Sequence, residues 1–186
     1  GVGVNQTCQK EDSFSMLWRD AFESIKYAKP IEGLGFGSPS SNRVATLGEK
    51  LPAAPTPRDV VAALRAIDVP IVFVFDEFDQ LQHSQVADAF AETIKALLDH
   101  TVPSKIVLVG VGDNIDQLIA SHASIERAIV QVPMPRMAAS ELHEIIATGS
   151  NDLGMTWDPD AARRVVKLSQ GLPHYVHRLA LASVRE

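Results

Sequence analysis

Three carboxylates follow directly after a strongly apolar run of the chain. The run covers residues 71–75, and Asp76, Glu77 and Asp79 come at its end. If the run is a strand, it delivers these side chains to the carboxyl edge of a sheet, where ligands collect in open α/β folds. Carboxylates so placed can hold a divalent metal ion and polarise an attacking water. The alternative is a solvated acidic turn in which Asp76 or Asp79 caps the following helix.

The elements that must position these carboxylates can be predicted from the apolar pattern. Residues 71–75 are five β-forming apolar residues without alternation, which is typical of a strand covered on both faces of a parallel sheet. A helix of about four turns and a second buried strand at residues 105–111 follow, and this order implies a right-handed parallel crossover. A short helix at residues 115–120 and a last strand at residues 129–132 complete the pattern. The longer helix is marked by Ala87, Phe90, Ala91, Ile94, Leu97 and Leu98.

The segment before the central strand predicts further α/β elements. Residues 2–4 resemble the end of a short strand, and an amphipathic helix with the candidate caps Asp12 and Ser13 follows. Residues 30–55 are rich in Gly, Pro and Ser without periodicity, so we expect a long loop there. A short helix is predicted to begin at Thr56. The amphipathic helix is marked by Phe14, Leu17, Trp18, Phe22 and Ile25.

The pattern changes in the last third of the chain, where no strand is evident beyond Met137. Helical apolar faces follow instead; one helix begins after Asp158, and a last one is predicted at residues 173–184. We therefore expect an α/β part at residues 1–134 and a small helical part at residues 135–186.

Length and composition limit the class of protein. The chain has 186 residues, of which 46% are hydrophobic and 22% are charged, as in one globular domain with a buried core. No apolar stretch approaches the roughly 18 residues of a membrane span, no signal-peptide layout is present, and Cys8 is the only cysteine. We expect a soluble, cytoplasmic protein without a disulfide framework. The net charge of −6 argues against direct nucleic-acid binding, which rests on clustered Lys and Arg.

From about residue 71 to residue 186, the chain resembles the later half of an AAA+ ATPase, closest to the branch with STAND-like and transposition-associated ATPases. Asp76 and Glu77 match the Walker B motif of that family. The resemblance implies that Asp76 holds Mg²⁺ and that Glu77 polarises the water that attacks the terminal phosphate of ATP. The implied fold is α/β, a P-loop NTPase-like parallel sheet sandwiched by helices, with a small C-terminal helical lid.

The resemblance also implies roles for polar residues further along the chain. Asn114, or its neighbour Asp113, matches the sensor 1 position that orients the attacking water; a turn explains the same composition. Arg127 lies where the family places an arginine finger that reaches a neighbouring subunit's nucleotide, and a surface ion pair is its alternative. His174 or Arg178 matches the nucleotide-facing sensor 2 group, and both could equally be exposed helix residues.

One motif of the family is missing from the chain. No Gly-x-x-x-x-Gly-Lys-[Ser/Thr] occurs, and the glycine-containing segments at residues 1–4 and 33–37 lack the Lys and hydroxyl residue that cradle phosphates. No normal ATP site can be assembled from this chain alone, so ATP and Mg²⁺ are expected as ligands of the intact parent. If residues 2–4 end the family's second strand, the first strand and the P-loop lie upstream.

The absent first strand leaves a gap in the expected sheet. In the family it lies between the strands predicted here at residues 105–111 and 129–132. These strands must then pair directly or leave backbone edges that seek a partner. A homo-oligomer or strand exchange between chains is therefore expected.

Two functions from different classes stay open. The chain is either a fragment of an AAA+ ATPase, inactive alone, or a non-catalytic protein-interaction or regulatory module derived from such a domain. The process that the parent serves is not encoded in these motifs. An unrelated receiver-like domain with Asp76 as an acceptor ranks third, because it explains the helical tail and the adjacent Glu77 poorly.

Overall fold

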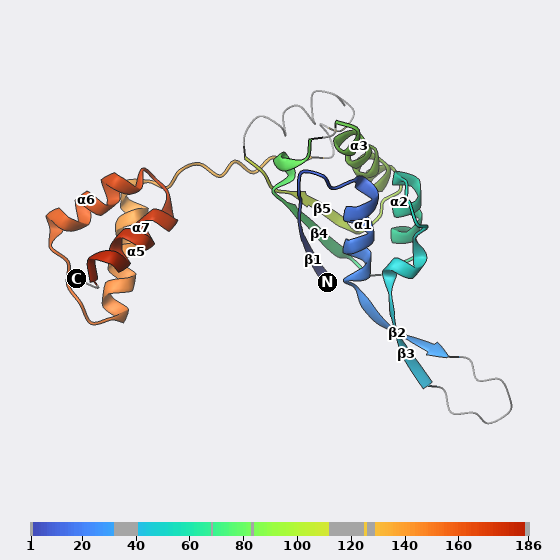
Figure 1. Ribbon diagram of the computed structural model, residues 1–186, viewed down its shortest axis with the longest axis horizontal. Helices are drawn as coiled ribbons and strands as arrows, with labels where there is room; N and C mark the ends of the chain where they lie inside the picture. Colours follow the sequence, from blue (N-terminus) through green and yellow to red (C-terminus); the bar gives the residue numbers. More distant parts are fainter. Residues whose placement is uncertain are drawn as a thin grey trace. The chain divides into compact units, whose positions relative to one another are not determined.

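The chain consists of two units, residues 1–130 and residues 131–186. The computed structural model describes residues 2–31, 41–67, 69–82, 84–111, 125 and 129–184. The first unit is α/β and the second is helical (Figure 1). The division falls four residues before the boundary that the sequence predicts after residue 134.

The first unit is built on a three-stranded parallel sheet with the strand order β1-β4-β5. β4 (Ile71–Asp76) is central, with β1 (Val2–Thr7) on one side and β5 (Lys105–Leu108) on the other. The register of β1 against β4 places Thr7 opposite Asp76. The predicted strand before the carboxylates and its parallel pairing with the next strand are confirmed.

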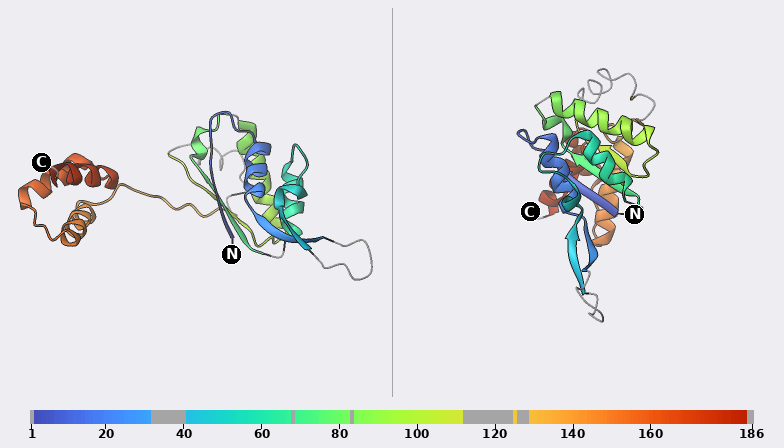
Figure 2. Two further views of the ribbon diagram at one scale, coloured as in Figure 1. Left: turned by 60° about the horizontal axis from the view of Figure 1, so that its bottom comes forward. Right: turned by 90° about the vertical axis from the view of Figure 1, so that its right-hand side faces the viewer.

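Three helices of the first unit lie on the same face of this sheet (Figures 1 and 2). They are α1 (Phe14–Glu23), α2 (Pro57–Arg65) and α3 (Ser84–Asp99). Their apolar sides cover alternate residues of the central strand, all of them buried: Ile71, Phe73 and Phe75.

Burial alternates along β4, which corrects the expectation of a strand covered on both faces. Val72 and Val107 lie on the face opposite the three helices and are 39% and 42% exposed. Within the part of the chain that the structure describes, helices cover one face of the sheet and not both. An apolar run therefore signals β-forming residues on both faces of the strand, but it does not show that both faces are covered.

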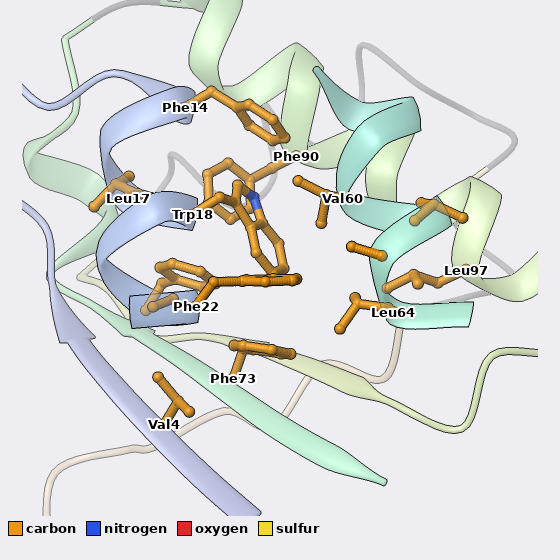
Figure 3. Close-up of a cluster of buried hydrophobic side chains, with 14 of the residues drawn as sticks. Val4, Phe14, Leu17, Trp18, Phe22, Val60, Leu64, Phe73, Phe90 and Leu97 are labelled. Atoms are coloured by element: carbon orange, nitrogen blue, oxygen red, sulfur yellow. The ribbon is translucent and has the colours of Figure 1, made fainter. Parts of the chain in front are cut away.

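An aromatic cluster forms the centre of the first unit's core (Figure 3). α1 begins at the N-cap Ser13, whose hydroxyl accepts a hydrogen bond from the Met16 amide. This start directs Trp18 into the core, where its side chain is fully buried. Five phenylalanine rings have their centres 5.0–6.2 Å from that of Trp18: Phe14, Phe22, Phe73, Phe75 and Phe90.

The segment at residues 30–55, predicted as a long loop, contains β-structure. β2 (Lys26–Ile31) pairs antiparallel with β3 (Ser41–Thr46), and a 3₁₀ helix follows at Leu47–Lys50. Of the side chains that the structure describes in this ribbon, Ala45 is buried and the others are half-buried or exposed. The prediction is wrong here because an exposed ribbon carries no apolar alternation for a sequence pattern to detect.

Two predicted helix starts are confirmed by their caps. Thr56 accepts a hydrogen bond from the Asp59 amide, and the Asp59 carboxylate accepts one from the Thr56 amide, so α2 begins with a capping box. Asp158 accepts hydrogen bonds from the amides of Asp160 and Ala161 at the start of α6. Side-chain acceptors at these positions satisfy amides that lack a partner inside the helix.

The second unit is a cluster of helices with its own small core. α5 (Ala139–Asp152), α6 (Pro159–Ser169) and α7 (Pro173–Val184) form it, and α7 has the bounds that the sequence predicts. Gly171, at a φ of +85° between α6 and α7, occupies the left-handed region that favours glycine. The buried apolar residues are Leu142, Ile146, Ala162, Val165, Val166 and Val176.

Residues 129–132, predicted as the last strand, do not form one. Val130 and Val132 are 87% and 72% exposed, and none of the described strands pairs with them. β-Forming residues make a strand only where a partner completes the ladder. The helix predicted at residues 115–120 lies outside the described residues. None of the described helices is long and apolar enough to cross a membrane.

Candidate functional site

The carboxyl edge of the sheet brings Asp76 beside the end of β1. Thr7 lies opposite Asp76, and the Cys8 amide donates a 2.8 Å hydrogen bond to the Asp76 carbonyl oxygen. The Asp76 carboxylate, which is half-buried, accepts a 2.9 Å hydrogen bond through Oδ1 from the Glu77 amide. The strand and this bond together hold the first carboxylate of the motif in a fixed position.

Glu77 turns the chain sharply at the end of β4. It has the left-handed conformation, with φ 55° and ψ 35°, which costs a residue with a side chain about 1–3 kcal/mol. Backbone hydrogen bonds on both sides hold the turn: Val109 donates to Phe75 at 2.9 Å, and Phe78 donates to Val109 at 2.8 Å. The exposed Glu77 side chain therefore projects from a turn that is anchored to the end of the neighbouring strand.

Asp79 connects this turn to the end of β5. Its Oδ1 accepts a 3.1 Å hydrogen bond from the Val111 amide. Gly110 is needed for this approach, because a Cβ atom there would lie 2.9 Å from the same oxygen. From the sequence, Asp79 is one of three carboxylates at the end of the strand or a cap of the following helix. Its contact with Gly110 could not be predicted, since no spacing pattern relates residues about thirty positions apart. The structure assigns Asp79 a positioning role at the edge that holds Asp76.

Cys8 is a buried thiol next to these acids, and both its burial and their charges raise its pKa. Burial and then the negative charges of Asp12, Asp76, Asp79 and Glu77 raise the pKa of the Cys8 thiol to about 12. The sequence analysis considered Cys8 only for disulfides and zinc. The contribution of these charges to the raised pKa indicates a negative potential at the carboxyl edge of the sheet.

The pKa of Cys8 predicts a pH dependence of stability. Because the folded-state pKa of about 12 exceeds the reference value of 9.0, the neutral thiol contributes stability in full below about pH 9, and this is lost as pH rises toward 12. We expect the free energy of unfolding of the unaltered protein to fall more steeply above about pH 9 than that of Cys8→Ala, which has no thiol to titrate. Urea unfolding at a series of pH values measures the difference. Parallel pH profiles for the two proteins would contradict the assignment.

The described residues around Asp76 do not form a metal cage. Among the described residues, no group of three or more His, Cys, Asp or Glu side chains is arranged to hold a metal ion. Mg²⁺ commonly binds through one or two carboxylates, with water and phosphate oxygens as the other ligands. As a half-buried carboxylate, Asp76 has the chemistry of one such ligand.

The other predicted site residues are not brought to this edge by the described structure. Asn114 and Arg127, like Asp113, lie outside the described residues. His174 and Arg178 are exposed on α7 of the second unit, and the His174 ring centre lies 4.5 Å from that of Tyr175. Asp76 and Glu77 belong to the first unit, so the predicted carboxylate and sensor 2 groups stand in separate units.

Two concave regions of the described structure lie in the second unit. One, of about 720 Å³, is lined by α6 and α7 and includes Arg163, Arg164 and Lys167. The other, of about 630 Å³, is lined by α5 and α7 and includes His177. His174 and Arg178 line neither of them.

No known protein-family model matches this chain, and no curated protein does.

Proposed function

We propose that the chain is part of an AAA+ type nucleotide-hydrolysing module, with Asp76 as metal-binding residue and Glu77 as the group that polarises water. A P-loop segment of the intact parent would supply the phosphate cradle, so ATP and Mg²⁺ are proposed as ligands of that parent. The observation that carries the proposal is the position of Asp76 and Glu77 at the carboxyl end of the central parallel strand. Ligands of open α/β sheets bind at this edge.

The two carboxylates differ in the way that this reaction requires. Asp76 is half-buried and fixed by the strand and by the Glu77 amide, which suits a metal ligand. Glu77 is exposed and begins a turn, so its carboxylate is accessible to a water molecule. A bound Mg²⁺ would neutralise phosphate charge. Glu77 would accept a hydrogen bond from the attacking water and then take its proton.

The negative potential at this edge supports a requirement for the cation. Besides burial, Asp12, Asp76 and Asp79 contribute to the raised pKa of Cys8, so several unit charges act on one small region. The phosphates of a nucleotide without a cation would be repelled there. Binding at this edge should therefore depend on Mg²⁺ more strongly than binding at a neutral or basic site.

The open edge of β5 supports the same proposal. β5 is the last strand of the described sheet, and none of the described strands pairs with its outer side. If β1 is the family's second strand, the missing first strand belongs beside β5. A strand added there would end at the carboxyl edge, and the P-loop that follows it would come close to Asp76.

Four further residues complete the proposal as candidates. Asn114 would orient the attacking water, and Arg127 would reach the nucleotide of a neighbouring subunit. His174 or Arg178 of α7 would be the sensor 2 group that faces the nucleotide. These roles rest on the resemblance of their sequence positions to the AAA+ motifs.

Asp76→Asn tests the metal-binding role. Asparagine keeps an oxygen for the Glu77 amide but loses the charge that attracts Mg²⁺, so we expect Mg-ATP affinity to fall at least about tenfold. ATP affinity without Mg²⁺ should not fall, because the substitution removes a negative charge that repels the phosphates. Calorimetric titration of the full product of the gene measures both, with Asp20→Asn, an exposed carboxylate of α1, as the matched control.

One result of this titration would contradict the metal-binding role of Asp76. The 186-residue chain alone, without a P-loop, should give no detectable heat with Mg-ATP. Tight binding by this chain that persists in Asp76→Asn would show a phosphate site elsewhere, and the proposed role of Asp76 would fail.

The second candidate is a non-catalytic interaction module. It is favoured by the apolar face of the sheet opposite the helices, where Val72, Val107 and Val109 are exposed, and by the edge of β5. Parallel sheets are normally covered on both faces, and open edges accept strands. In this case a homo-oligomer formed through the sheet, with no ATP binding by the full gene product, would be the expected finding.

A further inference from the structure

The second unit contains an apolar groove between α5 and α7. Its volume is about 630 Å³. Leu153 and Leu181, which line it, are 67% and 52% exposed. Apolar surface that stays open to water in a helical unit indicates an interaction site. The other large apolar residues of the lining are Met137, Ile145, Ile146, Met155, Trp157 and Val184.

The rim of this groove is acidic. The charged side chains among its described lining residues are the carboxylates Glu141, Glu144 and Asp152, with His177 and without Lys or Arg. Glu141 caps α5 by accepting a hydrogen bond from the Ala138 amide. Glu144 and Asp152 are exposed to solvent. The groove therefore fits an occupant that combines apolar and cationic side chains.

The position of Asp152 is unfavourable for the helix that carries it. Asp152 is the last residue of α5, and the last turn of this helix has no basic residue. The negative end of the helix dipole disfavours a carboxylate there. Asp152 places an exposed negative charge at the groove, where it can pair with a cationic partner.

α6 presents the complementary chemistry on the same unit. Arg164 and Leu168 lie four residues apart and so on the same side of the helix, and Lys167 is adjacent. Leu168 is 66% exposed, although the inward residues of α6, such as Val165, are buried. Arg and Lys stems add apolar contact while their heads reach carboxylates. These three residues line the concave region of α6 and α7 described above. Leu168 is nevertheless exposed, and an exposed leucine flanked by two cations matches an apolar groove with an acidic rim.

We propose that the α6 surface of one copy docks into the α5–α7 groove of a second copy. Leu168 would enter the groove, Arg164 would pair with Asp152, and Lys167 would pair with Glu144. Because the two surfaces are different parts of the same unit, the contact is head-to-tail, and repetition builds a ring or an open chain of copies. The contact involves neither Asp76 and Glu77 nor the edge of β5, so it stands independently of the nucleotide chemistry.

A charge-reversal series tests this contact in the full 186-residue chain. Sedimentation velocity of the unaltered protein should show mass that grows with concentration beyond the dimer, and less so in about 1 M salt, where charges are screened beyond about 3 Å. Asp152→Lys and Arg164→Glu should each lower the association constant at least about tenfold. The double variant should recover association, because its reversed charges again face each other. Glu92→Lys, an exposed carboxylate reversed on α3, is the matched control and should associate like the unaltered protein.

The series separates lost association from lost folding. Asp152→Lys replaces an acid with a base at a helix C-terminus, so circular dichroism should show equal or higher thermal stability. A protein that stays monomeric at every concentration would overturn the proposal, as would association that is insensitive to both reversals. Weakened single variants without recovery in the double variant would also reject the proposed pairing. Binding of a foreign basic helix without self-association would assign the groove to another partner and reject the second copy.

Discussion

Trp18→Ala should lower the free energy of unfolding of the first unit by about 3–5 kcal/mol, the range for removing a large aromatic side chain from a core. Trp18 is fully buried, and its ring meets Phe22 of its own helix, Phe73 and Phe75 of β4, and Phe90 of α3 (Figure 3). The indole thus joins α1 and α3 to the strand that carries the candidate site. Because small domains are stable by about 5–15 kcal/mol, the loss is a large part of the total.

Trp18→Phe is the matched control for this substitution. Among the residues that the structure describes, none provides a hydrogen-bond acceptor within reach of the buried Trp18 Nε1. An unsatisfied buried donor costs about 1–3 kcal/mol, and phenylalanine removes it while keeping most of the ring contacts. We expect Trp18→Phe to lose less than half of what Trp18→Ala loses in urea unfolding followed by circular dichroism. If Trp18→Phe and Trp18→Ala lost equal stability, the contacts of an aromatic ring at this position would not stabilise the core.

The parallel crossover could be predicted because its residues meet strong local requirements. Apolar β-formers that end abruptly at Asp76, followed by a helical pattern and then another apolar run, have few other solutions. Caps such as Thr56 and Asp158 are also local, since each acceptor serves amides two or three residues away. These features reappear in the structure close to their predicted positions.

The features that could not be predicted depend on contacts between distant residues. The bond from the Val111 amide to Asp79, and the need for Gly110 beside it, join positions that only the fold brings together. The left-handed turn at Glu77 is a second case, because glutamate has no preference for that conformation. A strand was predicted at residues 129–132 from β-forming residues alone, although strands need a neighbour.

Glu77→Gln should lower ATP turnover by at least about 100-fold, the lower end of what general base catalysis contributes. Glutamine has nearly the shape of glutamate, so the turn at φ 55° and its bonds to Val109 should persist. It cannot accept the proton of the attacking water at neutral pH. ATP binding should therefore remain while hydrolysis is lost, which a mere unfolding of the site would not produce. Glu92→Gln removes an exposed glutamate of α3 and should leave turnover unchanged.

Steady-state ATP hydrolysis by the full product of the gene, measured for the unaltered protein, Glu77→Gln and Glu92→Gln, is the most direct test of the proposed function. The proposed function predicts Mg²⁺-dependent turnover in the unaltered protein and in Glu92→Gln, and retained ATP binding without turnover in Glu77→Gln. Turnover in Glu77→Gln equal to that of the unaltered protein, or no ATP binding and no hydrolysis in any of the three proteins, would contradict it.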